Sequence, residues 1–272
     1  DCDDLCELFR RAFRANIENH FRRGLPLLIE HAKARLVNNQ SPDRSFEVGH
    51  RHYDLGNDLY RAMLDKRMIY SCGRWKDAAT LDEAQEAKLD LICRKIGLAA
   101  GQRVLDIGCG WGGFARFAAE RYGVCVVGVT ISREQQALAE EVCRGLDVEI
   151  RLQDYRELNE TFDAIVSVGM FEHVGCKNYR TFFEVARRCL RSDGLMLLHT
   201  IGNTTSHHEI DPWINRHIFP NAVLPSAVQI TRAVEDLFII EDWHNFGYDY
   251  SRTLLAWHEN FERAWPGLSG RY

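Results

Sequence analysis

Val104-Leu-Asp-Ile-Gly-Cys-Gly-Trp-Gly-Gly113 predicts a buried strand that ends in a glycine turn and leads into a helix from about residue 112 to residue 121. Gly108 and Gly110 have no Cβ, so they can adopt positive φ and let the backbone approach a ligand closely. The free N–H groups at the start of the following helix would point at that ligand. The stretch therefore predicts a nucleotide-binding turn at the end of a parallel strand.

The residues around the turn narrow the class of ligand. A phosphate-binding P-loop needs Lys-Ser/Thr after its glycines, and Trp111-Gly-Gly-Phe114 stands there instead, which excludes it. A dinucleotide site favours an acidic residue at the end of the next strand, whereas Val124-Cys-Val-Val-Gly-Val-Thr130 ends in threonine. On this stretch alone, a tight strand–helix connection without a ligand stays an open alternative.

Composition sets the class of protein. With 272 residues and 46% hydrophobic content, the chain suits one large domain or one domain with an appendage. It has no apolar run long enough to span a membrane. The net charge of −5 argues against general nucleic-acid binding. Nine scattered cysteines favour a reduced cytosol, and the absence of an initial methionine suggests a piece of a longer protein.

From residue 101 onward, predicted strands alternate with predicted helices. The strands are expected at 103–108, 124–130, 148–153, 162–169, 194–201 and 237–243, and the helices at about 112–121, 132–144, 177–190 and 226–235. The near-continuous apolar runs at 162–168 and 195–198 suit strands that are covered on both faces. The pattern predicts an α/β fold with a doubly wound, mostly parallel sheet.

Two further regions flank this core. Apolar residues at four-residue intervals predict an amphipathic helix at 5–21, which either packs on the main body or lies on a membrane surface. A capping box at Thr80 predicts the start of another helix, which runs to about residue 96. An insertion at 203–225 carries apolar residues that line a cleft or form a small core; both alternatives are open for Trp213, Ile214, Ile218 and Phe219. His50 and His52 lack a third ligand at a recognised spacing, so no metal site is predicted.

Six motifs in register resemble the bacterial cyclopropane-fatty-acid synthase family over essentially the whole chain. They are Asp106-Ile-Gly-Cys-Gly-Trp-Gly-Gly113, Val127-Gly-Val-Thr-Ile-Ser132, Val168-Gly-Met-Phe-Glu-His-Val-Gly175, Leu198-His-Thr-Ile-Gly202, Asp211-Pro-Trp-Ile-Asn215 and Glu241-Asp-Trp-His-Asn-Phe-Gly247. The resemblance implies a Rossmann-like class I S-adenosylmethionine methyltransferase domain at 70–272, preceded by a helical segment at 1–69. Family members extend beyond both ends of this chain, so the last strand of the domain is expected to be missing.

The resemblance implies that S-adenosylmethionine donates a methylene to the cis double bond of an unsaturated phospholipid acyl chain, which closes a cyclopropane ring. The positions that match the family's cofactor contacts are Tyr70, Ser71, Gly108, Cys109, Gly110, Thr130, Ile131, Gln135 and Tyr155. Thr130 and Gln135 can hydrogen-bond a ribose or methionine group, which offers a reason why no acidic residue is needed there. Tyr155 can stack on an adenine ring.

The resemblance also implies a bound bicarbonate ion that acts as the base. The matching residues are Cys72, Glu172, His199, Ile201 and Tyr250, with Cys72 and Ile201 contributing backbone N–H groups, so Cys72 is not expected to be a nucleophile. Glu172 would anchor His199, and His199 and Tyr250 would donate to the anion. Glu172 and His199 follow two different predicted strands whose carboxyl ends meet at one edge of the sheet.

The resemblance further implies an unsaturated phospholipid as substrate, a cytoplasmic location with peripheral contact to the inner face of the membrane, and no nucleic-acid partner; a homodimer is left open. One alternative is a small-molecule N-methyltransferase of the same fold. Another is a cofactor-binding module without catalytic activity, against which the presence of Glu172, His199 and Tyr250 argues.

Overall fold

The computed structural model describes residues 4–15, 56–208 and 211–271. The chain forms two compact units, residues 1–39 and residues 40–272. The first unit contains helix α1 (Leu5–Arg14), in which Glu7 pairs with Arg10 and Arg11 one turn later. Residues 16–21 of the helix predicted at 5–21, together with His50 and His52, lie outside the described residues. The predicted division at residue 69/70 stays a prediction.

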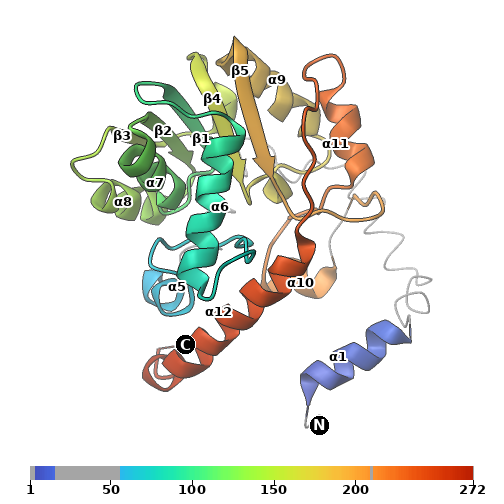
Figure 1. Ribbon diagram of the computed structural model, residues 1–272. Helices are drawn as coiled ribbons and strands as arrows, with labels where there is room; N and C mark the ends of the chain where they lie inside the picture. Colours follow the sequence, from blue (N-terminus) through green and yellow to red (C-terminus); the bar gives the residue numbers. More distant parts are fainter. Residues whose placement is uncertain (1–3, 16–55, 209–210, 272) are drawn as a thin grey trace. The chain divides into compact units, whose positions relative to one another are not determined.

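The second unit is built on a five-stranded parallel sheet in the order β3-β2-β1-β4-β5, as Figure 1 shows. The strands are β1 (Arg103–Ile107), β2 (Cys125–Thr130), β3 (Val148–Leu152), β4 (Phe162–Val168) and β5 (Leu190–His199). Every neighbouring pair is parallel, which confirms the predicted doubly wound sheet. The winding reverses between β1 and β4, so a ligand is expected outside the carboxyl ends of these two strands.

Helices cover both faces of the sheet. They are α6 (Leu81–Lys95), α7 (Gly113–Tyr122), α8 (Arg133–Val142), α9 (Tyr179–Cys189) and α11 (Ala227–Val234), with short 3-10 turns η1 (Tyr155–Glu157) and η2 (Phe171–His173). On β1, Val104 packs into the core with α6 and α7, whereas Leu105 and Ile107 pack into the core with α9 and α11. Alternate side chains of one strand therefore fill two separate cores.

The sixth predicted strand, at 237–243, is wrong, because the segment has no regular secondary structure. Leu237 and Phe238 pack against the core, but Ile239 is 90% exposed. A strand needs a neighbour to accept its backbone hydrogen bonds, and within the described residues no strand pairs with this segment. The apolar run was therefore sufficient to predict burial at its start and insufficient to predict a strand.

Three more helices complete the described part of this unit: α5 (Asn57–Met63), α10 (Pro212–His217) and the long α12 (Gly247–Leu268). Asn260 on α12 donates to the carbonyl of Met63 at 3.0 Å, and Trp257 is buried with Tyr60 and Trp111 in a third core cluster. Neither α10 nor α12 was predicted as a helix. Among the described helices, none is long and apolar enough to cross a membrane.

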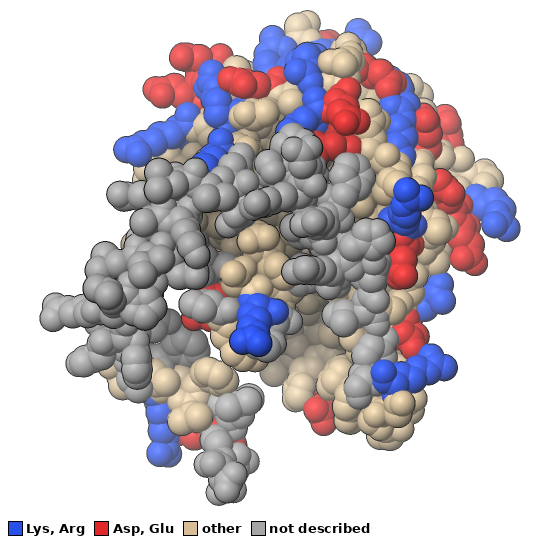
Figure 2. Space-filling view, turned by 180° about the vertical axis from the view of Figure 1, so that it is seen from behind, with Lys and Arg blue, Asp and Glu red and all other residues tan. Residues whose placement is uncertain are grey.

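The surface charge is mixed. On the face drawn in Figure 2, Lys and Arg side chains are interspersed with Asp and Glu side chains over the upper part and the right edge, while the described residues near the centre are largely uncharged. Nucleic-acid-binding proteins usually gather basic side chains on one face. The absence of a nucleic-acid partner stays a prediction.

Candidate active site

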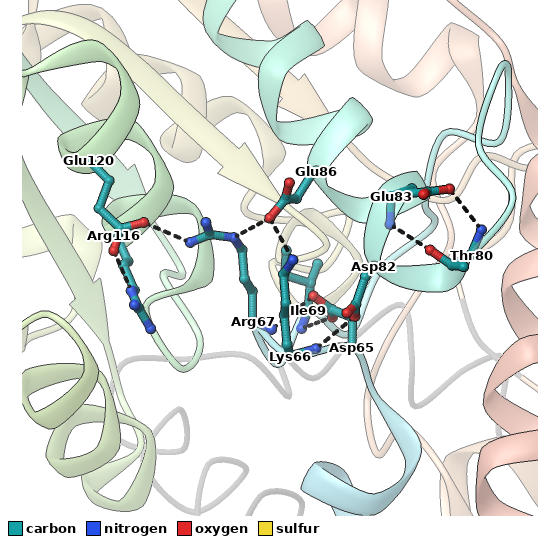
Figure 3. Close-up of polar contacts among 10 residues, drawn as sticks. All are labelled: Asp65, Lys66, Arg67, Ile69, Thr80, Asp82, Glu83, Glu86, Arg116 and Glu120. Carbon is teal, nitrogen blue, oxygen red and sulfur yellow. Dashed lines mark hydrogen bonds and ion pairs between the residues drawn. The ribbon is translucent and has the colours of Figure 1, made fainter.

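A polar network fixes the segment that leads into the site. Asp65 accepts hydrogen bonds from the N–H groups of Ile69 and Arg67, at 2.8 and 2.9 Å. The guanidinium of Arg67 bridges Glu86 on α6 and Glu120 on α7, at 3.3 and 3.1 Å (Figure 3). The side chain of Arg67 is only 10% exposed, so these ion pairs are screened by solvent less than surface pairs are. The segment is therefore tied to both helices just before Tyr70.

A cavity of about 200 Å³ opens at the carboxyl ends of β1, β2 and β4. All the residues predicted to contact the cofactor line it: Tyr70, Ser71, Gly108, Cys109, Gly110, Thr130, Ile131, Gln135 and Tyr155. The structure brings them together from five separate stretches of sequence. We call this space the first cavity.

The glycine turn forms one wall of the first cavity. Gly108 has φ +83° and Gly110 has φ +53°, a region that side chains of L residues rarely adopt. A Cβ on Gly108 would lie 2.6 Å from Cγ of Met170. A Cβ on Gly110 would meet no atom of the described chain within 4 Å. A side chain at Gly108 would thus clash with the protein itself, whereas one at Gly110 would project into open space in the described structure.

The β2 and β3 side of the first cavity is polar and aromatic. The Thr130 hydroxyl donates to Oε1 of Gln135 at 2.9 Å, and Tyr155 is buried edge-on against Phe182. Asp154, which the sequence analysis did not select, also lines the cavity and forms an ion pair with Arg156 at 2.6 Å. Its position directly after the third strand was the signal that could have identified it.

Asp106 is a second residue that the sequence analysis did not select as a site residue. It lies at the end of β1, is 2% exposed and lines the first cavity. Burial raises the pKa of this carboxyl group to about 7. Among the described residues, Asp106 Oδ2 has no hydrogen-bonding partner, so a cation bound in the cavity would find an acceptor here.

A second, smaller cavity of about 50 Å³ adjoins the first and shares Tyr70, Ser71, Gly169 and His173 with it. The residues predicted to hold the base all line this second cavity: Cys72, Glu172, His199, Ile201 and Tyr250. The five residues that the resemblance assigned to one site therefore lie together in the fold. Their roles stay predictions.

Glu172 and His199 both line the second cavity, but no hydrogen bond joins them, so the expected anchoring of His199 by Glu172 is not present. Oε1 of Glu172 accepts the N–H of Ile201 at 2.7 Å, so this N–H is directed at the carboxylate, not at the position expected for an anion. In the described part of the chain, Oε2 of Glu172 and Nδ1 of His199 are buried and have no partner. Two buried polar atoms of one small cavity are thus left to bind something else.

Burial sets the protonation of these groups. It raises the pKa of Glu172, and burial, with a smaller effect from Lys88, lowers the pKa of His199 to about 3. His199 is therefore a neutral imidazole at physiological pH, with one N–H donor and one acceptor nitrogen. Burial also raises the pKa of Cys72 to about 11, which keeps its thiol protonated and agrees with the prediction that Cys72 is not a nucleophile.

Helix α12 supplies Tyr250 and is fastened beside Cys72 by polar contacts. Oγ1 of Thr253 accepts the N–H of Gly73 at 3.0 Å and the indole N–H of Trp75 at 2.9 Å. The carboxylate of Asp249 accepts the backbone N–H of Trp75 at 2.9 Å. Because Thr253 and Asp249 flank Tyr250 on α12, these bonds determine where the Tyr250 ring lies. Sequence reasoning missed both residues.

The insertion after β5 contributes apolar residues to the second cavity, and Phe219 is the one among the four that the sequence analysis considered. Phe219 lines the cavity, and its ring centroid lies 6.0 Å from that of Tyr70. Trp213 is 60% exposed, and Ile214 and Ile218 are half-buried. The cleft alternative is therefore supported for Phe219 and not for Trp213.

Comparisons with known proteins identify the family. Residues 40–270 match the family model described as mycolic acid cyclopropane synthetase. The chain belongs to this family. It is 56% identical, over all 272 residues and 71% of the relative, to the cyclopropane-fatty-acyl-phospholipid synthase of Escherichia coli strain K12. Membership in the cyclopropane synthetase family confirms the resemblance in the sequence motifs and the expectation that the chain is an enzyme of the methyltransferase class.

Solved structures agree with this assignment. The mycolic acid cyclopropane synthase CmaA1 complexed with SAH and CTAB has a TM-score of 0.75 and 34% identity, with 80% of this chain and 83% of that chain covered. Coclaurine N-methyltransferase, bound to N-methylheliamine and SAH, has a TM-score of 0.77 and 27% identity, with 96% of this chain and 80% of that chain covered. The cyclopropane synthetase family therefore shares its fold with an enzyme that methylates an amine.

Proposed function

We propose that this enzyme uses S-adenosylmethionine to convert the cis double bond of an unsaturated acyl chain, carried by a membrane phospholipid, into a cyclopropane ring. The observation that carries the proposal is the pair of adjoining cavities. The first fits a nucleoside cofactor. The second has apolar walls and holds the buried atoms Glu172 Oε2 and His199 Nδ1, for which the described residues offer no hydrogen-bonding partner. The 56% identity to a cyclopropane-fatty-acyl-phospholipid synthase supports the choice of substrate.

The first cavity fits the cofactor by its chemistry. Thr130 and Gln135 offer hydroxyl and amide groups for a ribose, and Tyr155 offers an aromatic face for adenine. The unpartnered Oδ2 of Asp106 offers an acceptor for an ammonium group. When bound, S-adenosylmethionine supplies an electron-poor methyl group on a positively charged sulfur. SAH in the related CmaA1 structure supports the same ligand class here.

The second cavity presents apolar walls to a substrate. Phe219, Ala222 and Leu224 form these walls, and all three come from the segment that follows α10. An acyl chain whose reacting carbons lie against these walls would keep water away from those carbons, which protects a cationic centre from hydrolysis. The polar groups lie at the other wall, where a proton must be removed to close the ring.

We propose that a bicarbonate ion is the base, held by Glu172, His199 and Tyr250. Bicarbonate has both an O–H donor and oxygen acceptors, which suits a carboxylate oxygen and a neutral imidazole N–H in one small cavity. Burial raises the pKa of Tyr250, so its hydroxyl stays protonated and can donate. Ile201 would then act through Glu172, whose Oε1 its N–H orients, a change from the role that the resemblance implied.

We also propose that the enzyme works in the cytoplasm and contacts the inner face of the membrane peripherally. Large apolar side chains are exposed on the stretch that enters α12 and on the helix itself: Ile239, Ile240, Trp243, Tyr248, Leu254 and Leu255. Exposed apolar patches often mark sites that bind a membrane or another protein. Binding to phospholipid vesicles, measured by co-sedimentation, tests this part of the proposal.

A small-molecule N-methyltransferase is the second candidate, because coclaurine N-methyltransferase shares the fold at 27% identity. Labelled S-adenosylmethionine offered with either unsaturated phospholipid or amine acceptors separates the two. Label in cyclopropane acyl chains, identified by mass spectrometry, supports the first proposal. Label only in amines would overturn it.

Glu172→Gln tests the role of the second cavity. We expect kcat to fall on the order of ten- to a thousandfold, the range of lost acid–base or electrostatic contacts. Affinity for S-adenosylhomocysteine should be unchanged, because Glu172 does not line the first cavity. Glu184→Gln, an exposed carboxylate on α9 paired with Arg180, is the matched control and should retain full activity.

Bicarbonate depletion tests the base itself. Turnover should fall in degassed, bicarbonate-free buffer and return when bicarbonate is added back. Full activity without bicarbonate, or a Glu172→Gln defect confined to cofactor binding, would refute this assignment.

A further inference from the structure

Lys88 is a buried cation to which the proposed chemistry assigns no role. It lies in the middle of α6, is 1% exposed and lines the first cavity. Its ammonium group donates to the hydroxyl of Ser71 at 2.7 Å. Lysine is almost never fully buried unless it is paired, so its position beside a ligand cavity needs a physical reason.

No carboxylate neutralises Lys88 closely. Throughout the described ranges, none lies within 4.0 Å of its Nζ. The nearest interacting acid is Asp65, but both oxygens of Asp65 accept backbone N–H groups, from Ile69 and Arg67. Burial lowers the pKa of Lys88 to about 7, and Asp65 offsets this only in part. An anionic group in the cavity would therefore gain a charge-assisted hydrogen bond with little competition.

The sheet determines which end of a bound cofactor Lys88 would meet. Thr130, Gln135 and Tyr155 gather at the ends of β2 and β3, where a nucleoside fits. Ser71 lies over the end of β4 instead, because a Cβ on Gly169 would be 3.4 Å from the Cβ of Ser71. Lys88 and Ser71 are thus on the side of the first cavity that continues into the second cavity, where the methyl donor must lie.

We propose that Lys88, together with Ser71, binds the α-carboxylate of the S-adenosylmethionine methionine group. This rests on the proposed cofactor and adds a residue to its site. Asp106 offers the complementary acceptor for the α-ammonium from the end of β1, so the two charges of the amino-acid end meet opposite charges in a dry cavity. Lys88 therefore confers selectivity for a cofactor that carries a carboxylate.

The test compares S-adenosylhomocysteine with its decarboxylated analogue by calorimetry, in wild type and in Lys88→Met, a change that keeps side-chain length and removes the charge. In wild type, loss of the carboxylate should weaken binding about 10- to 100-fold, the range of one hydrogen bond between charged groups. In Lys88→Met, the two ligands should differ by less than about threefold. Lys95→Met, on the same helix but paired with Asp242, is the matched control and should behave as wild type.

The pH dependence gives a second readout that needs no variant. The titratable groups around Lys88 are Asp65, Cys72 and His199, with Asp106 in the same cavity. Because the free protein loses the Lys88 proton near pH 7 and the bound carboxylate requires it, discrimination between the two ligands should shrink from about pH 6 to about pH 8.5. Asp106 meets the ammonium, which both ligands carry, so it does not change this ratio.

The outcomes separate this inference from the proposed function. Equal loss of affinity for the decarboxylated ligand in wild type and Lys88→Met would overturn the inference and leave the cofactor assignment intact. Unchanged S-adenosylhomocysteine affinity in Lys88→Met, with a raised bicarbonate requirement, would also overturn the inference and would show that the Lys88 ammonium acts on the second cavity. Absence of S-adenosylhomocysteine binding in wild type would contradict the proposed function itself.

Discussion

Thr253→Val tests whether α12 holds the second cavity together. Valine has nearly the shape of threonine but cannot accept the hydrogen bonds that Oγ1 receives from the N–H of Gly73 and the indole N–H of Trp75. Thr253 is fully buried and Trp75 is 6% exposed, so water cannot replace the lost acceptor without a rearrangement. The substitution therefore leaves two donors unsatisfied at the junction of α12 with the segment that carries Cys72.

The magnitude follows from these two donors. Each unsatisfied buried group costs about 1–3 kcal/mol, so the free energy of unfolding should fall by about 2–6 kcal/mol. For a domain of this size, 1 kcal/mol corresponds to about 2–4 °C, which predicts a drop in Tm of about 4–24 °C. Tyr250 lies one turn away on the same helix, so turnover measured well below the new Tm should also fall.

The assay is thermal unfolding followed by circular dichroism, combined with turnover on unsaturated phospholipid. Thr253→Ser is the control, because it keeps the accepting oxygen and removes only a methyl group, at a cost of about 1 kcal/mol. The serine variant should resemble wild type in activity. If the valine variant unfolds at the same temperature as the serine variant and retains its turnover, the hydrogen bonds of Thr253 do not hold α12 in place.

Three further changes address the first cavity. Gly110→Ala should reduce affinity for S-adenosylhomocysteine in calorimetry and lower Tm by about 2–8 °C, the cost of an L residue at φ +53°, because its Cβ meets no atom of the described chain within 4 Å. Gly108→Ala should instead lower Tm strongly, since its Cβ would lie 2.6 Å from Cγ of Met170. Asp106→Asn should stabilise the free protein by up to about 4 kcal/mol above pH 7 and by little at pH 4. The sign follows from the raised pKa of about 7, because the wild-type protein is stable while Asp106 is protonated and loses stability as pH rises through that pKa. Identical unfolding curves for wild type and Asp106→Asn at both pH values would contradict this prediction.

The sheet was predictable because its three central strands, β1, β2 and β4, are short apolar runs that are buried along almost their whole length. Residues 162–169 were predicted as a strand, and β4 spans Phe162–Val168. The same reasoning failed at 237–243, where Ile239 and Ile240 are exposed. Apolar periodicity reports what a segment would bury if a partner were present, and a strand exists only where a neighbour accepts its hydrogen bonds.

The members of the site were predictable from motifs, whereas the contacts between them were not. The motif residues Glu172 and Ile201 were expected to act on one anion, but the N–H of Ile201 donates to Glu172 itself. Helix α12 was missed because its polar anchors, Thr253 and Asp249, bond to residues more than 170 positions away in the sequence. Partners that distant leave no periodic signal in a single chain.

Lys88 is a candidate binding residue that the residue pattern of α6 indicates. The buried side of α6 contains Leu81, Ala84, Leu89 and Ile92, and this stripe also includes the polar residues Gln85 and Lys88. A helix that places lysine on its apolar stripe must either turn that side chain toward water or provide it with a partner inside the fold. The amide of Gln85 donates to the carbonyl of Ser71 at 2.8 Å, and Lys88 donates to the Ser71 hydroxyl. Two polar residues on an otherwise apolar stripe therefore converge on one residue at the cavity wall, and such a violation of the helical pattern is a signal for a binding site that a single sequence does contain.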